Sequence, residues 1–253
     1  WSGEDSPMVA PGYIASMEKK YGRQSPIFKV RVLGEFIGAV DGVIPLELCE
    51  AAVIRDVDVN QTAPVVWGVD VARFGDDSSA LAKRKGNHQL EKVREWYGKD
   101  TMQTTGIVKA EWDKTPLNAR PVAINVDVIG IGAGVVDRLK ELGLPAYGVN
   151  VAESEAVNES KDRQFNRLRD ELWWKSREWL EARDCKLCDD GDLIGELTTP
   201  TYKILSNGLI QVERKDEMKA RGVKSPNMAD AWNLTFADTA LSNAWGHALK
   251  YPR

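Results

Sequence analysis

Three aspartates stand at positions where a carboxylate is unusual. Asp70 follows the apolar run VVWGV, Asp127 follows VAINV, and Asp230 lies in KSPNMADAWNLTFA, which has the spacing of an amphipathic helix. The two apolar runs predict buried strands, and burying a charged carboxylate costs free energy unless something neutralises it. A divalent cation shared by the three side chains would do so.

An oxygen-only set of ligands with no histidine or thiol nearby favours Mg²⁺ or Mn²⁺ over zinc. Two such ions ~3.5–4 Å apart can hold a phosphodiester, one activating a water and the other stabilising the departing oxygen. We expect Asp70 to bridge two Mg²⁺ or Mn²⁺ ions, and Asp127 and Asp230 to hold one each. Without metal the converging carboxylates repel one another, which raises at least one pKa. The predicted activity is therefore metal-dependent.

Each acid also has a structural explanation on its own. Asp70 can close a turn, Asp127 can cap the following helix, and Asp230 is favoured by the helix dipole in a first helical turn. Asp76 and Asp77 in RFGDDSS can orient a metal-bound water, which is the role expected of Asp76, or can simply form a turn. The three acids together, in this order, favour the metal site.

Five basic residues lie shortly before the third aspartate and are candidates for contact with a DNA backbone: Arg214, Lys215, Lys219, Arg221 and Lys224. They are interleaved with acidic residues, so a solvated surface is the alternative interpretation. Phosphate contacts of this kind would position nucleic acid without reading its sequence.

The glycines of GIGAG, residues 130–134, invite comparison with a dinucleotide-binding turn. They follow a late strand that already ends in an acid, whereas the Gly-rich turn of that fold follows the first strand. A cofactor site is therefore disfavoured. The glycines either allow a tight turn beside the metals or merely start a helix, and both interpretations stay open.

The elements that must position the acids follow from periodicity and turn signals. Strands are predicted at 65–73, 78–87, 88–98, 121–129 and 145–151, helices at 100–114, 132–143, 162–183, 191–200 and 227–241, and a hairpin at 201–215. This order predicts an α/β fold with a mixed central sheet, an antiparallel meander plus parallel strands, covered by helices on both faces. It is the ribonuclease H-like arrangement, in which the first and fourth strands are neighbours and would place Asp70 beside Asp127.

Composition limits the classes of partner and compartment. The net charge of −4 and the pI near 5.4 argue against a protein that holds nucleic acid through bulk positive charge, so contacts with DNA must be local or helped by metal. No apolar stretch approaches the ~20 residues of a membrane span, so we expect a soluble, unsecreted protein. The chain opens on Trp1, and we expect a fragment in which residues 1–60 form a lead-in segment, with an edge strand at 25–36, and residues 61–253 form the main domain.

Taken together, these motifs resemble the nuclease domain of the large terminase subunit of tailed bacteriophages. GVDVARFGDDSS, NVDVIGIGAGVVDRL and KSPNMADAWNLTFA resemble the three acidic motifs of that family. Residues 25–36 and 42–53 resemble the segment that joins its ATPase to its nuclease. Asp70, Asp127 and Asp230 match the metal-binding triad, and Asp76 matches an accessory acid of some members. Asn227 departs from the family, since many relatives have an acid there.

The resemblance implies a Mg²⁺- or Mn²⁺-dependent endonuclease that cuts concatemeric double-stranded viral DNA. It implies a ribonuclease H-like fold, a location in the cytoplasm of the infected bacterial host without contact with a membrane, and work beside an ATPase domain of the same full-length chain, a small terminase subunit and a portal protein. The leading hypothesis is a two-metal endodeoxyribonuclease with little sequence preference. Residues 1–60 would then lead in from an ATPase domain outside this sequence.

Two rival functions stay open. A non-catalytic docking domain would use the acidic cluster and the long charged helix to bind partners of the packaging motor. A nucleotide-binding ATPase on the same sheet would need a Gly-rich phosphate loop after the first strand, where RFGDDSS instead offers one glycine and two acids. The sequence contains no GxxxxGK[ST] motif, so ATP hydrolysis is not predicted.

Overall fold

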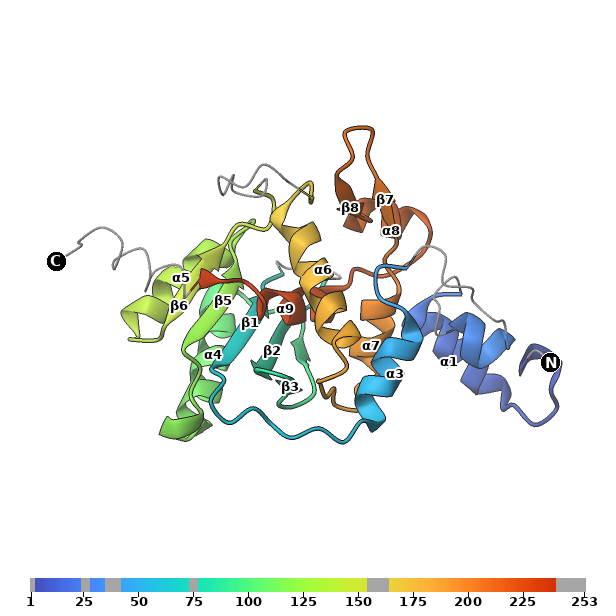
Figure 1. Ribbon diagram of the computed structural model, residues 1–253, viewed down its shortest axis with the longest axis horizontal. Helices are drawn as coiled ribbons and strands as arrows, with labels where there is room; N and C mark the ends of the chain where they lie inside the picture. The colour runs from blue at the N-terminus through green and yellow to red at the C-terminus, as the bar shows by residue number, and fades with distance from the viewer. Residues whose placement is uncertain (1–2, 24–27, 35–41, 73–76, 154–163, 240–253) are drawn as a thin grey trace.

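A mixed six-stranded sheet forms the centre of the protein (Figure 1). The computed structural model describes residues 3–23, 28–34, 42–72, 77–153 and 164–239. The strand order is β3-β2-β1-β5-β6, and β4 also pairs with β2. The strands are β1 Val65–Asp70, β2 Ser79–Lys85, β3 His88–Gln89, β4 Arg94–Trp96, β5 Ala123–Asp127 and β6 Ala146–Val149. The expected arrangement of a meander joined to parallel strands is confirmed.

The register of the two central strands places the first two aspartates side by side at one edge. β1 and β5 run parallel with Val69 opposite Val126. Asp70 and Asp127 are each the next residue along the same direction. Because parallel strands end at the same edge of a sheet, both carboxylates reach that edge.

Alternation along the strands sends the two acids to the same face. Trp67 and Val69 of β1, with Ile124 and Val126 of β5, join a core beneath the helices α4 (Thr101–Lys114) and α5 (Gly132–Glu141). Since successive side chains of a strand point to opposite faces, Asp70 and Asp127 emerge on the other face.

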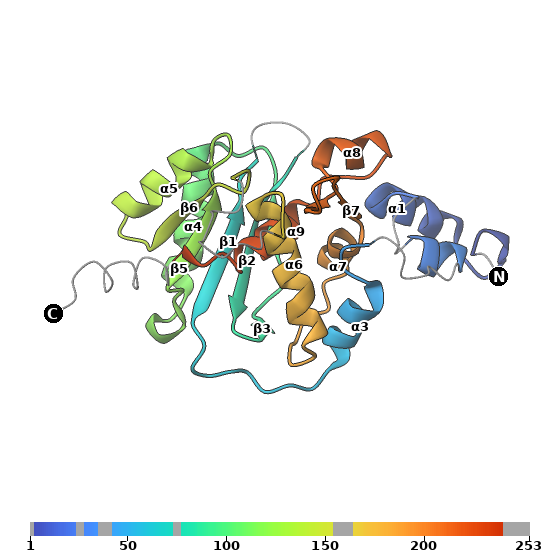
Figure 2. The same cartoon turned by 45° about the horizontal axis from the view of Figure 1, so that its top comes forward.

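That other face is covered by helices from the second half of the chain and from its beginning (Figure 2). Helix α9, Asn227–Leu234, lies directly on β1 and β2, and carries the third aspartate. Around it pack α6 Leu168–Glu181, α7 Gly191–Thr198 and α3 Leu46–Ile54. The three acids therefore approach one another from the sheet and from the helix that covers it.

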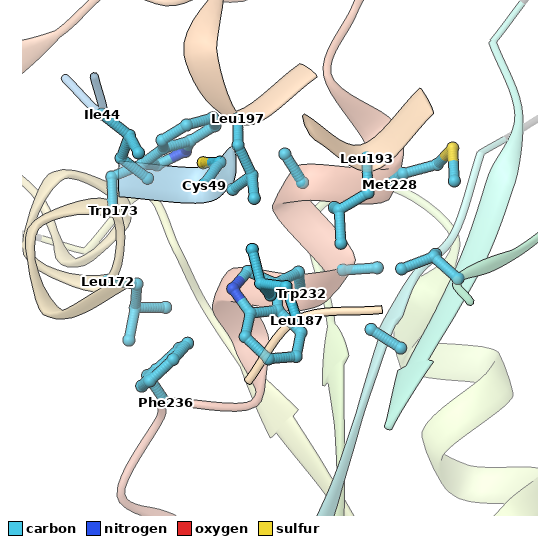
Figure 3. Packing of buried hydrophobic residues seen from close by; sticks show 14 of the residues in the cluster. Ile44, Cys49, Leu172, Trp173, Leu187, Leu193, Leu197, Met228, Trp232 and Phe236 are labelled. Carbon is cyan, nitrogen blue, oxygen red and sulfur yellow. The ribbon is translucent and has the colours of Figure 1, made fainter. Parts of the chain in front are cut away.

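The core around α9 is built on Trp232 (Figure 3). Its indole is fully buried, donates from Nε1 to Ser176 Oγ at 2.9 Å, and makes edge contacts with Trp179 and Phe236 at ring-centroid distances of 5.3 and 5.6 Å. Burying an indole of this size stabilises the packing of α9 by several kcal/mol. The apolar face of the helix thus fixes the position of its polar face.

Close approach of α9 to the sheet depends on Gly68. A Cβ at this position would lie 2.0 Å from the carbonyl oxygen of Ala231, a distance no side chain can accept. Both ends of the helix are also held. Glu196 Oε2 accepts from the Ala229 amide at 3.0 Å near the first turn, and Arg84 Nη2 donates to the Thr235 carbonyl at 2.6 Å at the end. The base at the end complements the helix dipole, while burial raises the pKa of the Glu196 carboxyl well above its usual value.

The remaining elements agree in part with those predicted from the sequence. The hairpin predicted at 201–215 is present as β7 (Tyr202–Ile204) and β8 (Ile210–Val212), which turn around Asn207 and Gly208. It is followed by α8, Lys215–Ala220. The predicted third strand is divided into β3 and β4, both of which pair with β2. Among the helices that the structure describes, none has the length and apolarity to cross a membrane.

The edge strand expected within residues 25–36 is wrong. The described part of that segment forms a single π-helical turn, Lys29–Leu33, ended by Gly34 with a φ of 67°. Phe28 and Val32 are both buried. Residues four apart share one side of a helix but also one face of a strand, so the apolar pattern could not distinguish the two. Helix α1, Pro11–Tyr21, precedes it near the N-terminus.

The predicted lead-in segment contributes to the main core. Val43, Ile44, Cys49 and Ala52 are buried in the same cluster as Trp232. Residues 43–52 are therefore packed against the main domain, and the division at residue 60 stays a prediction.

Replacing Gly68 with alanine is expected to lower the free energy of unfolding by about 3 kcal/mol, because the methyl group forces α9 away from β1. The matched control is Gly106→Ala in the exposed middle of α4, where a Cβ meets nothing within 4 Å. That change should stabilise the protein by about 0.5–1 kcal/mol through helix propensity. Urea unfolding measures both, and equal stability of the parent and the Gly68→Ala variant would contradict the close contact.

Candidate metal centre

The three aspartates of the sequence motifs line one cavity of ≈ 280 Å³. Asp70 comes from the end of β1, Asp127 from the end of β5 and Asp230 from the first turn of α9. Arg169 and Lys215 line the same cavity. Residues up to 160 positions apart in the chain are thus brought to one point, as the strand order predicts.

Lys215 joins two of the acids. Its Nζ lies 3.0 Å from Asp230 Oδ2 and 3.4 Å from Asp70 Oδ2, and it also donates to Asn227 Oδ1 at 3.3 Å. The side chain is 40% exposed, so it reaches the acids from the rim of the cavity. Of the five basic residues proposed to contact DNA, this one is engaged with the aspartates themselves.

Two residues of α6 that the sequence reasoning missed hold the other oxygen of Asp230. Arg169 Nε and Trp173 Nε1 lie 3.3 and 3.1 Å from Oδ1, and Arg169 Nη1 donates to the Glu213 carbonyl at 3.0 Å. Arg169 and Trp173 are four residues apart and therefore share one side of the helix. Their i, i+4 spacing on the helix predicted at 162–183 was the available signal in the sequence.

The partners of Asp230 keep it ionised. Burial alone would raise its pKa, but Arg169, Lys215 and the Trp173 hydrogen bond outweigh burial and lower the pKa below its usual value. Asp70 shows the opposite balance, since burial raises its pKa and the neighbouring Asp230 adds to the effect, while Lys215 opposes it. The negative charge of Asp230 is thus well compensated by its neighbours, and that of Asp70 is not.

Asp127 is the least compensated of the three. Burial raises its pKa to about 7, with a further contribution from Asp70, although the Ile129 amide donates to Oδ1 at 2.9 Å. Among the described residues, only two cations, Arg169 and Lys215, form ion pairs within the cluster of three aspartates, so negative charge is in excess there. A bound dication would remove that excess.

The glycines after Asp127 allow the tight turn considered from the sequence. A Cβ at Gly132 would lie 1.7 Å from the Asp127 carbonyl oxygen, and Gly130 has a φ of 81°, which favours glycine. Helix α5 can therefore begin directly beside the end of β5. Gly132 serves both interpretations, since it is also the first residue of the helix.

The chemistry of the donor set fits a hard cation, although no ligand cage is assembled. Within the described ranges, no group of three or more His, Cys, Asp or Glu side chains is arranged to hold a metal. The available donors are carboxylate oxygens, which Mg²⁺ and Mn²⁺ prefer. Asp230 Oδ2 is buried without a hydrogen bond of good geometry and has only the Lys215 ammonium beside it. The residues present fit such an ion, provided that Lys215 moves.

The accessory acids differ in what the structure says of them. Asp76, expected to orient a water, lies outside the described residues. Asp77 lines a second cavity of ≈ 620 Å³ and pairs with Lys219 at 3.1 Å. Burial works against its ionised form, but the hydrogen bonds from Lys219 and Ser225 lower its pKa. Asp77 therefore belongs to a neighbouring polar cavity.

The other basic candidates fall into two groups. Arg221 is held inside the protein, with bonds to Glu213 at 2.6 and 2.8 Å and to the Thr199 carbonyl at 2.7 Å. Arg214, Lys219 and Lys224 are exposed. Their contact with DNA stays a prediction.

Asn227 connects the two cavities. Its Oδ1 accepts from Lys215, and its Nδ2 donates to Ser78 Oγ at 3.1 Å. An aspartate at this position would lack the Nδ2 group that donates to Ser78, and would add a negative charge beside the three aspartates. Asn227 therefore bridges Ser78, the residue before β2, and Lys215, the first residue of α8.

Comparison with known proteins agrees with this fold. No protein-family model matches the chain. The probable terminase large subunit of Enterobacteria phage P7 is 24% identical over 252 residues, covering 96% of this chain and 50% of that protein, so the chain spans about half of this relative. The nuclease domain of the large terminase subunit of bacterial virus Sf6 matches with a TM-score of 0.61 and 21% identity, covering 77% of this chain and 98% of that one.

A second solved structure, the large terminase nuclease of thermophilic phage G20c with bound magnesium, has a TM-score of 0.55 and 14% identity, covering 78% of this chain and 97% of that one. Related structures of these two nucleases contain manganese and cobalt. The resemblance to terminase nuclease domains is confirmed, and the fold is ribonuclease H-like.

Replacing Lys215 with methionine should tighten Mn²⁺ binding about tenfold, because the ammonium competes with the metal for Asp70 and Asp230. The metal-free protein should lose about 2 kcal/mol, less than for a fully buried pair because Lys215 is half-exposed. Isothermal titration with Mn²⁺ and urea unfolding in EDTA measure the two effects. Lys203→Met, which removes an exposed pair with Glu217, is the control, and unchanged Mn²⁺ affinity in Lys215→Met would contradict the competition.

The metal-free protein should lose stability as the pH rises between about 4 and 7, in part through Asp127. Its folded pKa of about 7 exceeds the usual 3.8, so the folded state binds more protons across this window and its stability falls with pH. Asp127→Asn removes this contribution, and the free energy of unfolding in EDTA should then depend less on pH. Asp58→Asn, at an exposed position, is the control. Identical pH slopes for the parent and Asp127→Asn would contradict the assignment.

Proposed function

We propose that the chain is the metal-dependent nuclease domain of a phage DNA-packaging terminase, an endonuclease that cuts double-stranded DNA with little sequence preference. The observation that carries this proposal is the convergence of Asp70, Asp127 and Asp230 on one cavity at the edge of the sheet. The fold shared with terminase nucleases supports it. Structures of such nucleases with magnesium, manganese and cobalt support the use of a divalent cation.

The residues that line the cavity would have different roles in holding the metal ions. Asp70 interacts electrostatically with both other acids and would bridge two ions, while Asp127 and Asp230 would hold one each. The ions, Mg²⁺ or Mn²⁺, would supply Lewis-acid stabilisation of the phosphate and a more acidic water. Arg169 and Trp173 keep Oδ1 of Asp230 occupied and leave Oδ2 for the ion. Asp76 would orient a water.

DNA would be held by local contacts, because the net charge of −4 opposes attraction over a distance. The exposed Arg214 lines the aspartate cavity, and the exposed Lys219 and Lys224 line the adjacent one. Contacts from these side chains with phosphates would place the backbone over the acids without reading bases. Once metal displaces Lys215 from the acids, its ammonium group would also be free to contact phosphates. Arg221 would hold the surrounding chain through its bonds to Glu213 and the Thr199 carbonyl.

The same proposal includes the wider assembly. The chain spans about half of a probable terminase large subunit, and residues 1–60 would join the nuclease to an ATPase domain of the same full-length chain. The small terminase subunit and the portal protein would be its partners, the substrate would be concatemeric viral DNA, and the site of action would be the cytoplasm of the infected bacterium.

Nicking of supercoiled plasmid in Mg²⁺ or Mn²⁺ tests the nuclease assignment. Changes that merely reorient a metal ligand cost ~10–100-fold in activity, so Asp70→Asn, Asp127→Asn and Asp230→Asn should each lower the rate by about 100-fold or more. Asp58→Asn is the exposed control. If Asp70→Asn cuts as fast as the parent, the metal assignment fails.

The rival functions give different results. A docking domain predicts no cutting with any metal, and unchanged folding and partner binding after all three aspartates become alanine. An ATPase predicts saturable binding of magnesium-ATP in a calorimeter. Cutting by the parent, lost in the aspartate variants, together with no ATP binding, would favour the nuclease over both.

A further inference from the structure

Arg169 has more hydrogen-bonding capacity than its protein partners use. Nε bonds Asp230 and Nη1 bonds the Glu213 carbonyl, but the buried Nη2 has no acceptor among the described residues. Buried polar atoms are nearly always paired in folded proteins, so an unpaired guanidinium nitrogen requires an explanation. Arg169 lines the aspartate cavity.

The orientation of this guanidinium is fixed before any ligand arrives. Its carbon lies 5.6 Å from the centre of the Trp173 ring, and two bonds hold two of its three nitrogens. A planar guanidinium held in this way loses little freedom when a ligand binds. The third nitrogen is therefore preorganised for an acceptor.

A second unpaired group lines the same cavity. Asn233 is only 2% exposed, and neither its Oδ1 nor its Nδ2 has a partner among the residues described. It lies three residues after Asp230 on α9, so the two side chains share one side of the helix. The cavity thus contains an unpaired cationic donor from α6 and an unpaired amide from α9, beside the three acids.

We propose that Arg169 and Asn233 form a phosphate subsite that binds the DNA backbone inside the aspartate cavity. Arg169 Nη2 donates to a non-bridging phosphate oxygen, and Asn233 Nδ2 donates to the same phosphate or to the adjoining sugar oxygen. A phosphate is the acceptor because guanidinium groups bind it strongly through charge-assisted bonds. The subsite deepens the proposed nuclease function and rests on it for the identity of the ligand.

Arg169 would then have two roles that can be separated by experiment. Its Nε positions Asp230, which affects the metal, and its Nη2 contacts the phosphate, which affects DNA binding directly. A purely positioning residue would change Mn²⁺ affinity without removing an ionic contact with DNA. A phosphate contact would change the salt dependence of DNA binding, because each neutralised phosphate releases counterions.

The experiment measures binding of a fluorescent duplex of about 20 base pairs by anisotropy in Ca²⁺, over about 50 to 200 mM salt, with gels showing that the duplex stays intact. Arg169→Gln should weaken binding about tenfold and reduce the slope of log K against log salt by about 0.9. Asn233→Ala should weaken binding about threefold without a change in slope, because the lost donor is neutral. Arg177→Gln, the same change on α6 at a residue paired with Glu181, should bind as the parent does.

The outcomes separate this inference from the nuclease assignment. If the parent cuts plasmid but Arg169→Gln and Asn233→Ala bind duplex with parental affinity and slope, the subsite is overturned and the nuclease stands. If Arg169→Gln weakens only Mn²⁺ binding, measured by titration, Arg169 acts through Asp230 alone and the inference fails. Failure of the parent to bind duplex also overturns it.

If the parent does not cut plasmid, but both variants bind the duplex more weakly than the parent does, the subsite stands and the nuclease assignment is rejected. Thermal melting checks that each variant folds. If Arg169→Gln does not melt cooperatively, Asn233→Ala decides the matter, since its truncation removes no hydrogen bond from the protein. Parental duplex affinity in Asn233→Ala would then overturn the subsite.

Discussion

Among the described residues, two cations form ion pairs within a cluster of three carboxylates, and this imbalance of charge governs the site. Arg169 and Lys215 suffice for Asp230, whose pKa is lowered, but leave Asp70 and Asp127 with raised pKa values caused mainly by burial. Such an arrangement is stable without metal only because protons and Lys215 reduce the repulsion. Dications would replace both, so metal binding and the charge state of the acids are coupled.

The fold supplies the rigidity that this arrangement needs. Asp70 and Asp127 are fixed by adjacent parallel strands, and Asp230 is fixed because α9 is held against the sheet. Gly68 allows the close approach, and Trp232 anchors the apolar side of the helix in the core (Figure 3). With both helix ends bonded to Glu196 and Arg84, the third acid has little freedom to move away.

The sequence predicted what local patterns and strand order determine. Two acids at the ends of apolar runs, on strands that neighbour in a ribonuclease H-like order, were expected to meet, and the register of Val69 with Val126 confirms it. The placement of Lys215 was not predicted, because it depends on how α8 follows the hairpin rather than on residue type. The contacts of Arg169 and Trp173 with Asp230 were not predicted from the sequence either. Their partner, Asp230, is about 60 residues away, and the charged side of α6 resembles an ordinary solvated surface.

The central claim, that Asp70, Asp127 and Asp230 jointly hold hard cations, is tested most directly by a crystal of the protein soaked in Mn²⁺. Anomalous scattering locates the ions independently of any assumption about their ligands. The account predicts two peaks in the cavity, with oxygens of all three aspartates at about 2.0–2.2 Å, distances typical of small octahedral cations, and with Lys215 Nζ displaced from Asp70 and Asp230. A cavity without an anomalous peak, in a crystal that binds manganese elsewhere and keeps Lys215 between the two acids, would contradict it.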